Sequence, residues 1–258
     1  MRLGIHCSVR NGFLPALEEA KALDCEAMQM LPYRRHHVPT TEEMAAFRAA
    51  RAVSGVALLL AHSRFVPNLG ASDESRQRRS IELLAAELRL SEELGAQAYV
   101  LHAGAYSAGS DLKTGISQVA AAIAQAVGDT GAKIPILLEN VPGGGRRMGG
   151  SLEELAELFN AVARKSVRVG ICLDTAHAWA QGYAISTAEG MLKFIAQTHR
   201  LIGTEHVWAF HLNDSRAPLG SHLENHWHWG QGFVGLEGLK VLLDRPEFAD
   251  VVGIVETP

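Results

Sequence analysis

The sequence predicts an α/β fold, and more specifically a (β/α)8 TIM barrel, on three observations. Strand-like and helix-like segments alternate along all 258 residues without a linker or a low-complexity tract. The strand-like segments are dense in Val, Ile and Leu, as expected for parallel strands that are buried on both faces. Eight such segments with helices between them fit the barrel. An open, doubly wound sheet is the alternative, but no GxGxxG motif follows the first segment, which weakens its dinucleotide-binding form.

The expected elements follow one another in a regular order. The eight predicted strands span residues 2–8, 27–31, 57–63, 98–104, 134–140, 168–175, 207–214 and 251–257. The predicted helices include the amphipathic stretches 15–23, 73–94, 115–127, 151–163, 191–202 and 236–243. Ser151 followed by Glu154 predicts a capping box at the start of its helix. The chain stops two residues after Glu256, so we expect the helix after the last strand to be missing.

Composition favours one soluble, enzyme-sized domain that spans residues 1–258. The apolar content of 47% is enough for a large core, and no apolar stretch has the length of a membrane span. No signal-peptide pattern follows Met1, so we expect a cytoplasmic protein, and a monomer. The three cysteines, Cys7, Cys25 and Cys172, form no CxxC motif and predict buried thiols rather than disulfides.

Six of the apolar runs end on a side chain that can bind a metal. These residues are His62, His102, Glu139, Asp174, His211 and Glu256. A parallel barrel gathers the ends of its strands at one rim, so candidates from distant parts of the chain would converge there. Imidazoles and carboxylates in one place predict a metal centre. A single histidine after an apolar run is more often a core or rim residue, so the prediction rests on the set.

Three motifs near the later strands add candidates of the same kind. In LDTAH, His177 follows Asp174 by three positions. In HLND, Asp214 follows His211 by three positions and is a further candidate. The segment SHLENHWHWGQG is rich in glycine and tryptophan, which suits a site loop better than a core element. Its candidates are Glu224, His226 and His228.

Motifs along the whole chain carry a resemblance to a known family. They are GIHCS, AHSRFVPNLG, LHAGAY, LLENVPGGG, ICLDTAHAWAQGY, HLNDSRAPLGSHLENHWHWGQG and VETP. With these motifs the chain resembles the endonuclease IV family of apurinic/apyrimidinic (AP) endonucleases, and LDTAHAWAQGY and HLNDS are the most specific of them. The resemblance implies a barrel with three zinc ions that hydrolyses the phosphodiester bond 5′ to an abasic site. The substrate would be double-stranded DNA, and the product would carry a 3′-hydroxyl, as in base excision repair.

The resemblance also implies a set of zinc ligands. They would be His62, His102 and Glu139 for the first ion, Glu139, Asp174, His211 and Glu256 for the second, and His177, Glu224 and His226 for the third. Glu139 would be catalytic because it links the two ions that lower the pKa of bound water, and manganese is an alternative at the carboxylate-rich second position. Two residues depart from the family: Glu224 stands in place of Asp, and Asn225 in place of Arg. We expect the glycines at 220, 230 and 232 to let this loop adjust to the longer Glu224.

The resemblance implies DNA contacts in the loops after the strands. Phe65 and Val66 match an intercalating pair of an aromatic and an aliphatic residue, and either Arg34 or Arg35 would insert beside them. An abasic nucleotide is inexpensive to flip out of the duplex because it has no base to unstack. The net charge of −4 does not indicate a nucleic-acid binder, but three divalent cations would bring the total to about +2, concentrated at the rim.

Two alternative functions remain open at this stage. A metal-dependent sugar isomerase or epimerase could use the same barrel, because a fold does not determine a function. Such sites hold one or two metals, so a third metal would distinguish the two enzymes. A DNA- or metal-binding homologue with decayed catalysis is the other alternative, and Glu224 is the residue that suggests it.

Overall fold

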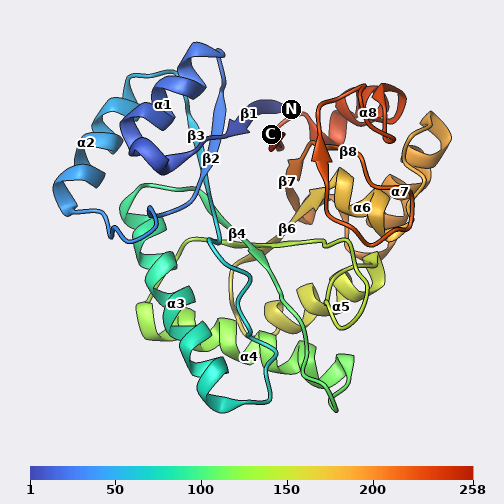
Figure 1. Cartoon of the computed structure of the whole chain (residues 1–258), viewed down its shortest axis with the longest axis horizontal. Coiled ribbons are helices and arrows are strands. Elements are labelled where there is room, and N and C mark those ends of the chain that lie inside the picture. The colour runs from blue at the N-terminus through green and yellow to red at the C-terminus, as the bar shows by residue number, and fades with distance from the viewer. Residues whose placement is uncertain (258) are drawn as a thin grey trace.

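The computed structural model describes residues 1–257 and contains a closed barrel of parallel strands (Figure 1). The strands are β1 (Arg2–His6), β2 (Ala27–Met30), β3 (Leu58–His62), β4 (Ala98–His102), β5 (Ile136–Glu139), β6 (Val169–Asp174), β7 (Val207–His211) and β10 (Val252–Val255). Their order around the barrel is β1-β10-β7-β6-β5-β4-β3-β2, so sequential strands are neighbours and β10 closes the ring against β1. The predicted TIM barrel is therefore confirmed. Each predicted strand is present but shorter at one or both ends, where the chain leaves the sheet for the neighbouring loop or, after β6, for a helix.

Helices surround the barrel on its outside (Figure 1). They are α1 (Phe13–Ala22), α2 (Thr41–Ala52), α3 (Glu74–Glu93), α4 (Leu112–Thr130), α5 (Leu152–Ala163), α6 (Thr175–Gln181), α7 (Ala188–Leu201) and α8 (Leu236–Leu243). Short 3-10 turns occur at η1 (Val9–Asn11), η2 (Thr204–His206) and η3 (Pro246–Phe248). Within residues 1–257 no helix follows β10. None of the helices in this range is long and apolar enough to cross a membrane.

Two helices, α2 and α6, were not among the predicted stretches. Helix α2 opens with a complete capping box, in which Thr40 Oγ1 accepts from Glu43 N and the Glu43 carboxylate accepts from Thr40 N. Helix α6 starts directly at the end of β6, and the Asp174 side chain caps it by accepting from His177 N over 2.7 Å. Because α6 follows β6 without a loop between them, no separate turn in the sequence indicated the start of a new helix.

The predicted capping box of α5 is only half formed. Ser151 Oγ accepts from Glu154 N, as expected. The Glu154 carboxylate, however, accepts from Gly149 N and Gly150 N instead of from Ser151 N. In this arrangement the Glu154 carboxylate satisfies two backbone N–H groups of the preceding turn, whereas a capping box would satisfy only the N–H of Ser151.

All three cysteines in the described chain are free thiols, as predicted. Cys7 and Cys172 are buried, and burial raises the pKa of each to about 12. Cys25 is only half-buried, so the prediction that all three are buried is wrong for this residue. It lies in the short connection between α1 and β2, where one side of the chain still faces solvent.

Candidate metal centre

The candidates at the strand ends belong to one inward-facing layer of the barrel. The apolar layer beneath them includes Ala27, Leu60, Val100, Leu137, Cys172, Ala209 and Ile254. Successive residues of a strand point to opposite faces, so a residue two positions further along points inward again. Two positions beyond these seven lie Gln29, His62, His102, Glu139, Asp174, His211 and Glu256. The strand period therefore directs all six predicted strand-end candidates, together with Gln29, to the same end of the barrel.

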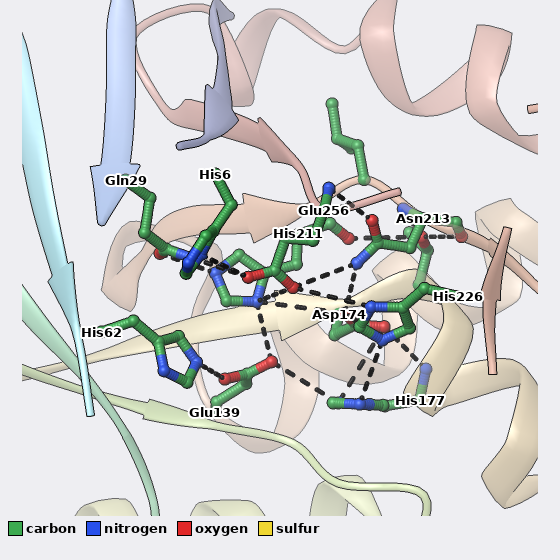
Figure 2. Close-up of polar contacts among 12 residues, drawn as sticks. His6, Gln29, His62, Glu139, Asp174, His177, His211, Asn213, His226 and Glu256 are labelled. Atoms are coloured by element: carbon green, nitrogen blue, oxygen red, sulfur yellow. Dashed lines mark hydrogen bonds and ion pairs between the residues drawn. The ribbon is translucent and has the colours of Figure 1, made fainter. Parts of the chain in front are cut away.

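Glu139 lies at the centre of this layer and is almost completely buried. Its Oε2 lies 3.1 Å from His62 Nε2 and 2.7 Å from His102 Nε2. Its Oε1 faces the other side, 2.8 Å from His211 Nδ1. One carboxylate thus faces two separate sets of imidazoles (Figure 2). This is the arrangement that a carboxylate shared between two metal ions requires.

Gln29 determines which nitrogen of His211 faces the centre. Gln29 Nε2 donates to Glu256 Oε1 over 2.7 Å, so its amide oxygen faces His211 Nε2, 2.9 Å away. His211 Nε2 must then carry the hydrogen, which leaves the lone pair of the neutral ring on Nδ1. That lone pair points at Glu139 Oε1 and lies 3.2 Å from Glu256 Oε2. An imidazole lone pair that faces two carboxylates is suited to a cation.

Two buried asparagines hold the carboxylates in place. Asn213 Nδ2 donates to Asp174 Oδ2 over 2.7 Å and to Glu256 Oε2 over 3.3 Å. Asn140 exchanges two hydrogen bonds with the backbone of Asp174. Gln29, Asn140 and Asn213 were not among the site residues predicted from the sequence. The sequence did indicate these residues, because Gln29 lies two positions after the inward-facing Ala27, and the two asparagines belong to the LLEN and HLND motifs.

The remaining candidates form a second part of the candidate centre: His177 lies on α6, Glu224 on the loop before the short strand β9 (His226–Trp227), and His226 on β9 itself. His177 Nδ1 donates to Asn140 O over 2.8 Å, so the lone pair of its neutral ring lies on Nε2. That atom lies 3.3 Å from His226 Nε2 and 3.8 Å from Glu224 Oε2. His226 Nε2 also lies 3.4 Å from Asp174 Oδ2. His177 is fully buried, whereas the Glu224 side chain is 55% exposed.

The donor atoms fit metal cations because several acceptors face one another. His62 Nδ1 donates to Ser63 O, so the lone pair on its Nε2 points at an oxygen of Glu139. Two ligands of one tetrahedral zinc, with bonds of about 2.0–2.2 Å, lie about 3.4 Å apart, which is close to the 3.3 Å between His177 Nε2 and His226 Nε2. Within residues 1–257, four groups bring metal-binding atoms within 4.8 Å of one another. They are His62–Glu139–His211, His102–Glu139–His177, Asp174–His177–His226 and Glu139–Asp174–His211–Glu256.

The electrostatics of the cluster favour positive charge. Burial opposes a charge on His177, but neighbouring carboxylates, chiefly those of Asp174 and Glu224, outweigh it and raise the pKa to about 10. The imidazole of His177, 3.8 Å from the carboxylate, in turn lowers the pKa of Glu224 to about 2. Burial also opposes ionisation of Glu139, yet His102 and His211 hold its pKa well below the usual range. Ionised carboxylates among these imidazoles will attract protons or metal ions, which compete for the same ring nitrogens.

Three of the predicted candidates, Asp214, Glu224 and His228, belong to none of the four groups found among the described residues. Asp214, on the short strand β8 (Asp214–Ser215), is buried, and its carboxylate accepts from backbone donors of the following loop. These donors are the N–H groups of Ser215, Gly230, Gly232, Val234 and Gly235. Its proximity to His211 in the sequence suggested a ligand. The structure instead gives it the role of organising the loop that carries Glu224 and His226.

The predicted DNA-contacting residues lie in loops on the same side of the barrel as the candidate ligands. Phe65 and Val66 are 60% and 57% exposed. Arg34 is held by Glu43, 3.1 Å from its Nη2, whereas Arg35 is exposed. Both arginines line a cavity of about 800 Å³, which His6 also lines. His6 lines the cavity of about 310 Å³ over the metal centre as well, so the two cavities adjoin.

Comparisons with known proteins agree with this geometry. A family model described as "Xylose isomerase-like TIM barrel" matches residues 17–258. A protein named "Probable endonuclease 4" from Chloroflexus aurantiacus is 34% identical over 262 residues, which cover 100% of this chain and 91% of the relative. The crystal structure of endonuclease IV from Thermus thermophilus superposes with a TM-score of 0.87 at 33% identity, covering 100% of this chain and 93% of that one.

The barrel alone is shared more widely. A D-tagatose 3-epimerase-like protein superposes with a TM-score of 0.72 at only 18% identity, covering 100% of this chain and 91% of its own. A likeness at that identity shows a common fold and nothing about chemistry. The relatives above 30% identity span the strand-end motifs and the His-rich loop alike, because they cover the whole of this chain. The chain therefore belongs to the endonuclease IV family within the xylose isomerase-like TIM barrels.

Proposed function

We propose that this protein is a zinc-dependent AP endonuclease that hydrolyses the phosphodiester bond 5′ to an abasic site in double-stranded DNA and leaves a 3′-hydroxyl. The observation that carries the proposal is the carboxylate of Glu139, whose two oxygens face two different sets of imidazoles. Hydrolysis of a phosphodiester needs a strong nucleophile and neutralisation of charge on the phosphoryl oxygens, and a pair of metal ions supplies both.

Three ions would be held by three sets of side chains. We assign His62, His102 and Glu139 to the first, Glu139, Asp174, His211 and Glu256 to the second, and His177, Glu224 and His226 to the third. Zinc suits this mixture of imidazole and carboxylate donors, and manganese is the alternative at the second set. Bound zinc lowers the pKa of water to about 7 and stabilises negative charge on phosphate and on the departing oxygen.

The chain's own residues orient these donors. When the rings are neutral, as metal binding requires, Gln29 directs the lone pair of His211 to Nδ1, and Asn140 directs that of His177 to Nε2. Asn213 ties Asp174 to Glu256, so the carboxylates cannot rotate away when charge develops on the substrate. Such hydrogen bonds to metal ligands usually change metal affinity about 10–100-fold.

Recognition of the abasic site would fall to the exposed loop residues. Phe65 and Val66 are exposed enough to enter the duplex where a base is missing. Arg35 is the better of the two arginine candidates because Arg34 is occupied by Glu43. The basic cavity that both line adjoins the metal centre, which suits a backbone that carries phosphates on both sides of the cleaved bond.

The proposal is tested with purified protein loaded with zinc. Emission spectroscopy should find three zinc ions per chain. A duplex with one tetrahydrofuran abasic analogue should be cut once, 5′ to the analogue, and a DNA polymerase should extend the resulting 3′ end. The same duplex without the analogue is the control. Zinc-loaded protein that leaves the abasic duplex intact, or that epimerises a ketohexose instead, would overturn the proposal.

A further inference from the structure

We propose that Glu87 of α3 is a positioning residue that fixes the β3–α3 loop, residues 63–73, against the β2–α2 loop, so that the two loops meet DNA as one rigid unit. The inference rests on the proposed function, because it assigns Glu87 a part in DNA binding. Its starting point is burial. Glu87 is 4% exposed, lies in none of the metal-binding groups found among residues 1–257, and yet a buried carboxylate needs a reason to be there.

The carboxylate of Glu87 holds Arg64, the second residue after β3. Its Oε2 accepts from Arg64 N over 3.1 Å and from the hydroxyl of Tyr99, a buried residue on β4. Tyr99 therefore fixes the direction of the carboxylate from the barrel wall, and the carboxylate fixes the backbone at Arg64. Phe65, one residue further on, is the exposed aromatic of the loop.

Arg64 extends the contact to the β2–α2 loop. Its guanidinium lies over the ring of Tyr33, 5.2 Å from the centroid, and over the ring of Phe65, 5.4 Å from the centroid. Its Nη1 also donates to Tyr33 O over 3.0 Å. Burial, together with the charge of Glu87, raises the pKa of the Tyr33 phenol to about 12, so this ring belongs to the same cluster. Glu87, Arg64 and Tyr33 thus join the loop of Phe65 to the loop of Arg34 and Arg35.

The hydrogen bonds between α3 and the tip of the β3–α3 loop lie on either side of residues 65–67. At the far end of the tip, Asn68 N donates to Ser80 Oγ of α3 over 3.0 Å. Beneath the tip lies a cavity of about 140 Å³, lined by Phe65, Val66 and Glu87 among others. Side chains over a cavity lack the contacts that would fix them by packing. The position of Phe65 and Val66 therefore depends on the two anchors that α3 supplies.

The experiment compares three variants with the wild type. Glu87→Leu removes the acceptor at similar volume, and Glu87→Gln keeps an amide oxygen that can accept from Arg64 N. Thr198→Val is the matched control, because Thr198 is also buried, on the distant helix α7, and its hydroxyl bonds only within its own helix. Each variant is tested for zinc content, for hydrolysis of bis(4-nitrophenyl) phosphate, and for affinity for the abasic duplex. This small diester is too short to reach the DNA-contacting loops, so its hydrolysis measures the metal centre alone.

Glu87→Leu should weaken binding of the abasic duplex about tenfold, as expected when an aromatic contact with a base is partly lost. Zinc content and hydrolysis of the small diester should stay within twofold of wild type. Glu87→Gln should recover most of the affinity, and Thr198→Val should not change it. On a Phe65→Ala background, Glu87→Leu should have no further effect, because coupled residues are not additive. Unchanged affinity, additive effects, or equal loss of small-diester hydrolysis would each overturn the proposal.

Hydrogen–deuterium exchange separates this inference from the proposed function. The amides of residues 64–68 should exchange faster in Glu87→Leu than in wild type, while α7 exchanges at the same rate in both. Unchanged exchange at residues 64–68 would overturn the role of Glu87 even if the wild type cleaves abasic DNA. If the wild type fails to cleave abasic DNA, the proposed function fails, and accelerated exchange would still establish Glu87 as the anchor of the loop.

Discussion

The two parts of the candidate metal centre differ in how they are held. On the strand side, Glu139, Asp174 and His211 are completely buried, and Asp174 lies opposite His211 in the sheet register. On the loop side, Glu224 is more than half exposed and its Oε2 remains 3.8 Å from His177 Nε2. The barrel determines the first set of positions through backbone hydrogen bonds, whereas the second depends on the conformation of one loop. We therefore expect substitutions on the strand side to have larger effects than those on the loop side.

The loop side is nevertheless organised from the barrel. The carboxylate of Asp214, three residues after His211, accepts from the backbone N–H groups of Ser215, Gly230 and Gly232. A Cβ at Gly232 would lie 2.5 Å from Asp214 Oδ1, so this glycine is needed for close packing. The glycines of the loop were expected to let it shift freely. At Gly232 that expectation is wrong, because the residue is fixed against the carboxylate that holds the loop.

The largest effect is expected from Glu139→Gln. The amide has one acceptor oxygen and no charge, so it cannot serve two sets of imidazoles at once. Loss of several kcal/mol of transition-state stabilisation corresponds to a fall of about 1,000-fold or more in the rate of abasic cleavage. The Tm should change little, because the fold rests on the apolar layers. Cleavage within tenfold of wild type would show that Glu139 does not bridge two ions. Circular dichroism and the Tm are measured on the same sample to establish that the variant folds.

A smaller loss is expected from Gln29→Leu, which tests the support of the strand side. Removal of the amide leaves His211 Nε2 and Glu256 Oε1 without their partners. Because two candidate ligands are released together, we expect zinc affinity to fall about 100-fold, the upper end of the usual range. Competition with a zinc chelator measures it. Gln118→Leu, on the distant helix α4, is the matched control. Equal affinity in Gln29→Leu and wild type would mean that the amide does not orient these ligands.

The sequence predicted the strand side well and the loop side less well, for a physical reason. Strand periodicity and barrel closure determine where residues such as His62 and Glu139 point, and both can be read from an apolar run and its last residue. The same period places Gln29, which was overlooked because an amide is not a metal ligand. The position of Glu224 follows no period. It depends on Asp214 accepting from backbone groups up to Gly235, a long-range pattern that sequence motifs do not encode.

A loss of similar or smaller size is expected from Phe65→Ala, which acts in the loops and not at the metals. Binding of the abasic duplex should weaken by about 1–3 kcal/mol, the usual contribution of an aromatic side chain stacked on a base. Zinc content should be unchanged, because Phe65 makes no contact with the candidate ligands. Fluorescence anisotropy with abasic and intact duplexes measures the difference. An equal loss of affinity for both duplexes would contradict a role in recognising the abasic site.

The smallest effect is expected from Glu224→Asp, which introduces the residue that the resemblance to the family implies at this position. If the loop is adjusted to the longer side chain, as the 3.8 Å approach to His177 Nε2 suggests, the shorter one retreats by roughly 1.5 Å, on the scale of one C–C bond. The separation would then exceed the distance of about 3.4 Å between two ligands of one zinc by a wide margin. Glu224→Asp should accordingly hold zinc no better than wild type and cut no faster.

In wild type the zinc at this set should be the first to leave during titration with a chelator, because Glu224 is exposed while Glu139 and Asp174 are buried. Its loss should slow cleavage more than it weakens DNA binding. A clear gain in zinc stoichiometry or rate from Glu224→Asp would show instead that the native loop places Glu224 poorly for zinc binding, and that the strand side alone sustains the wild-type activity.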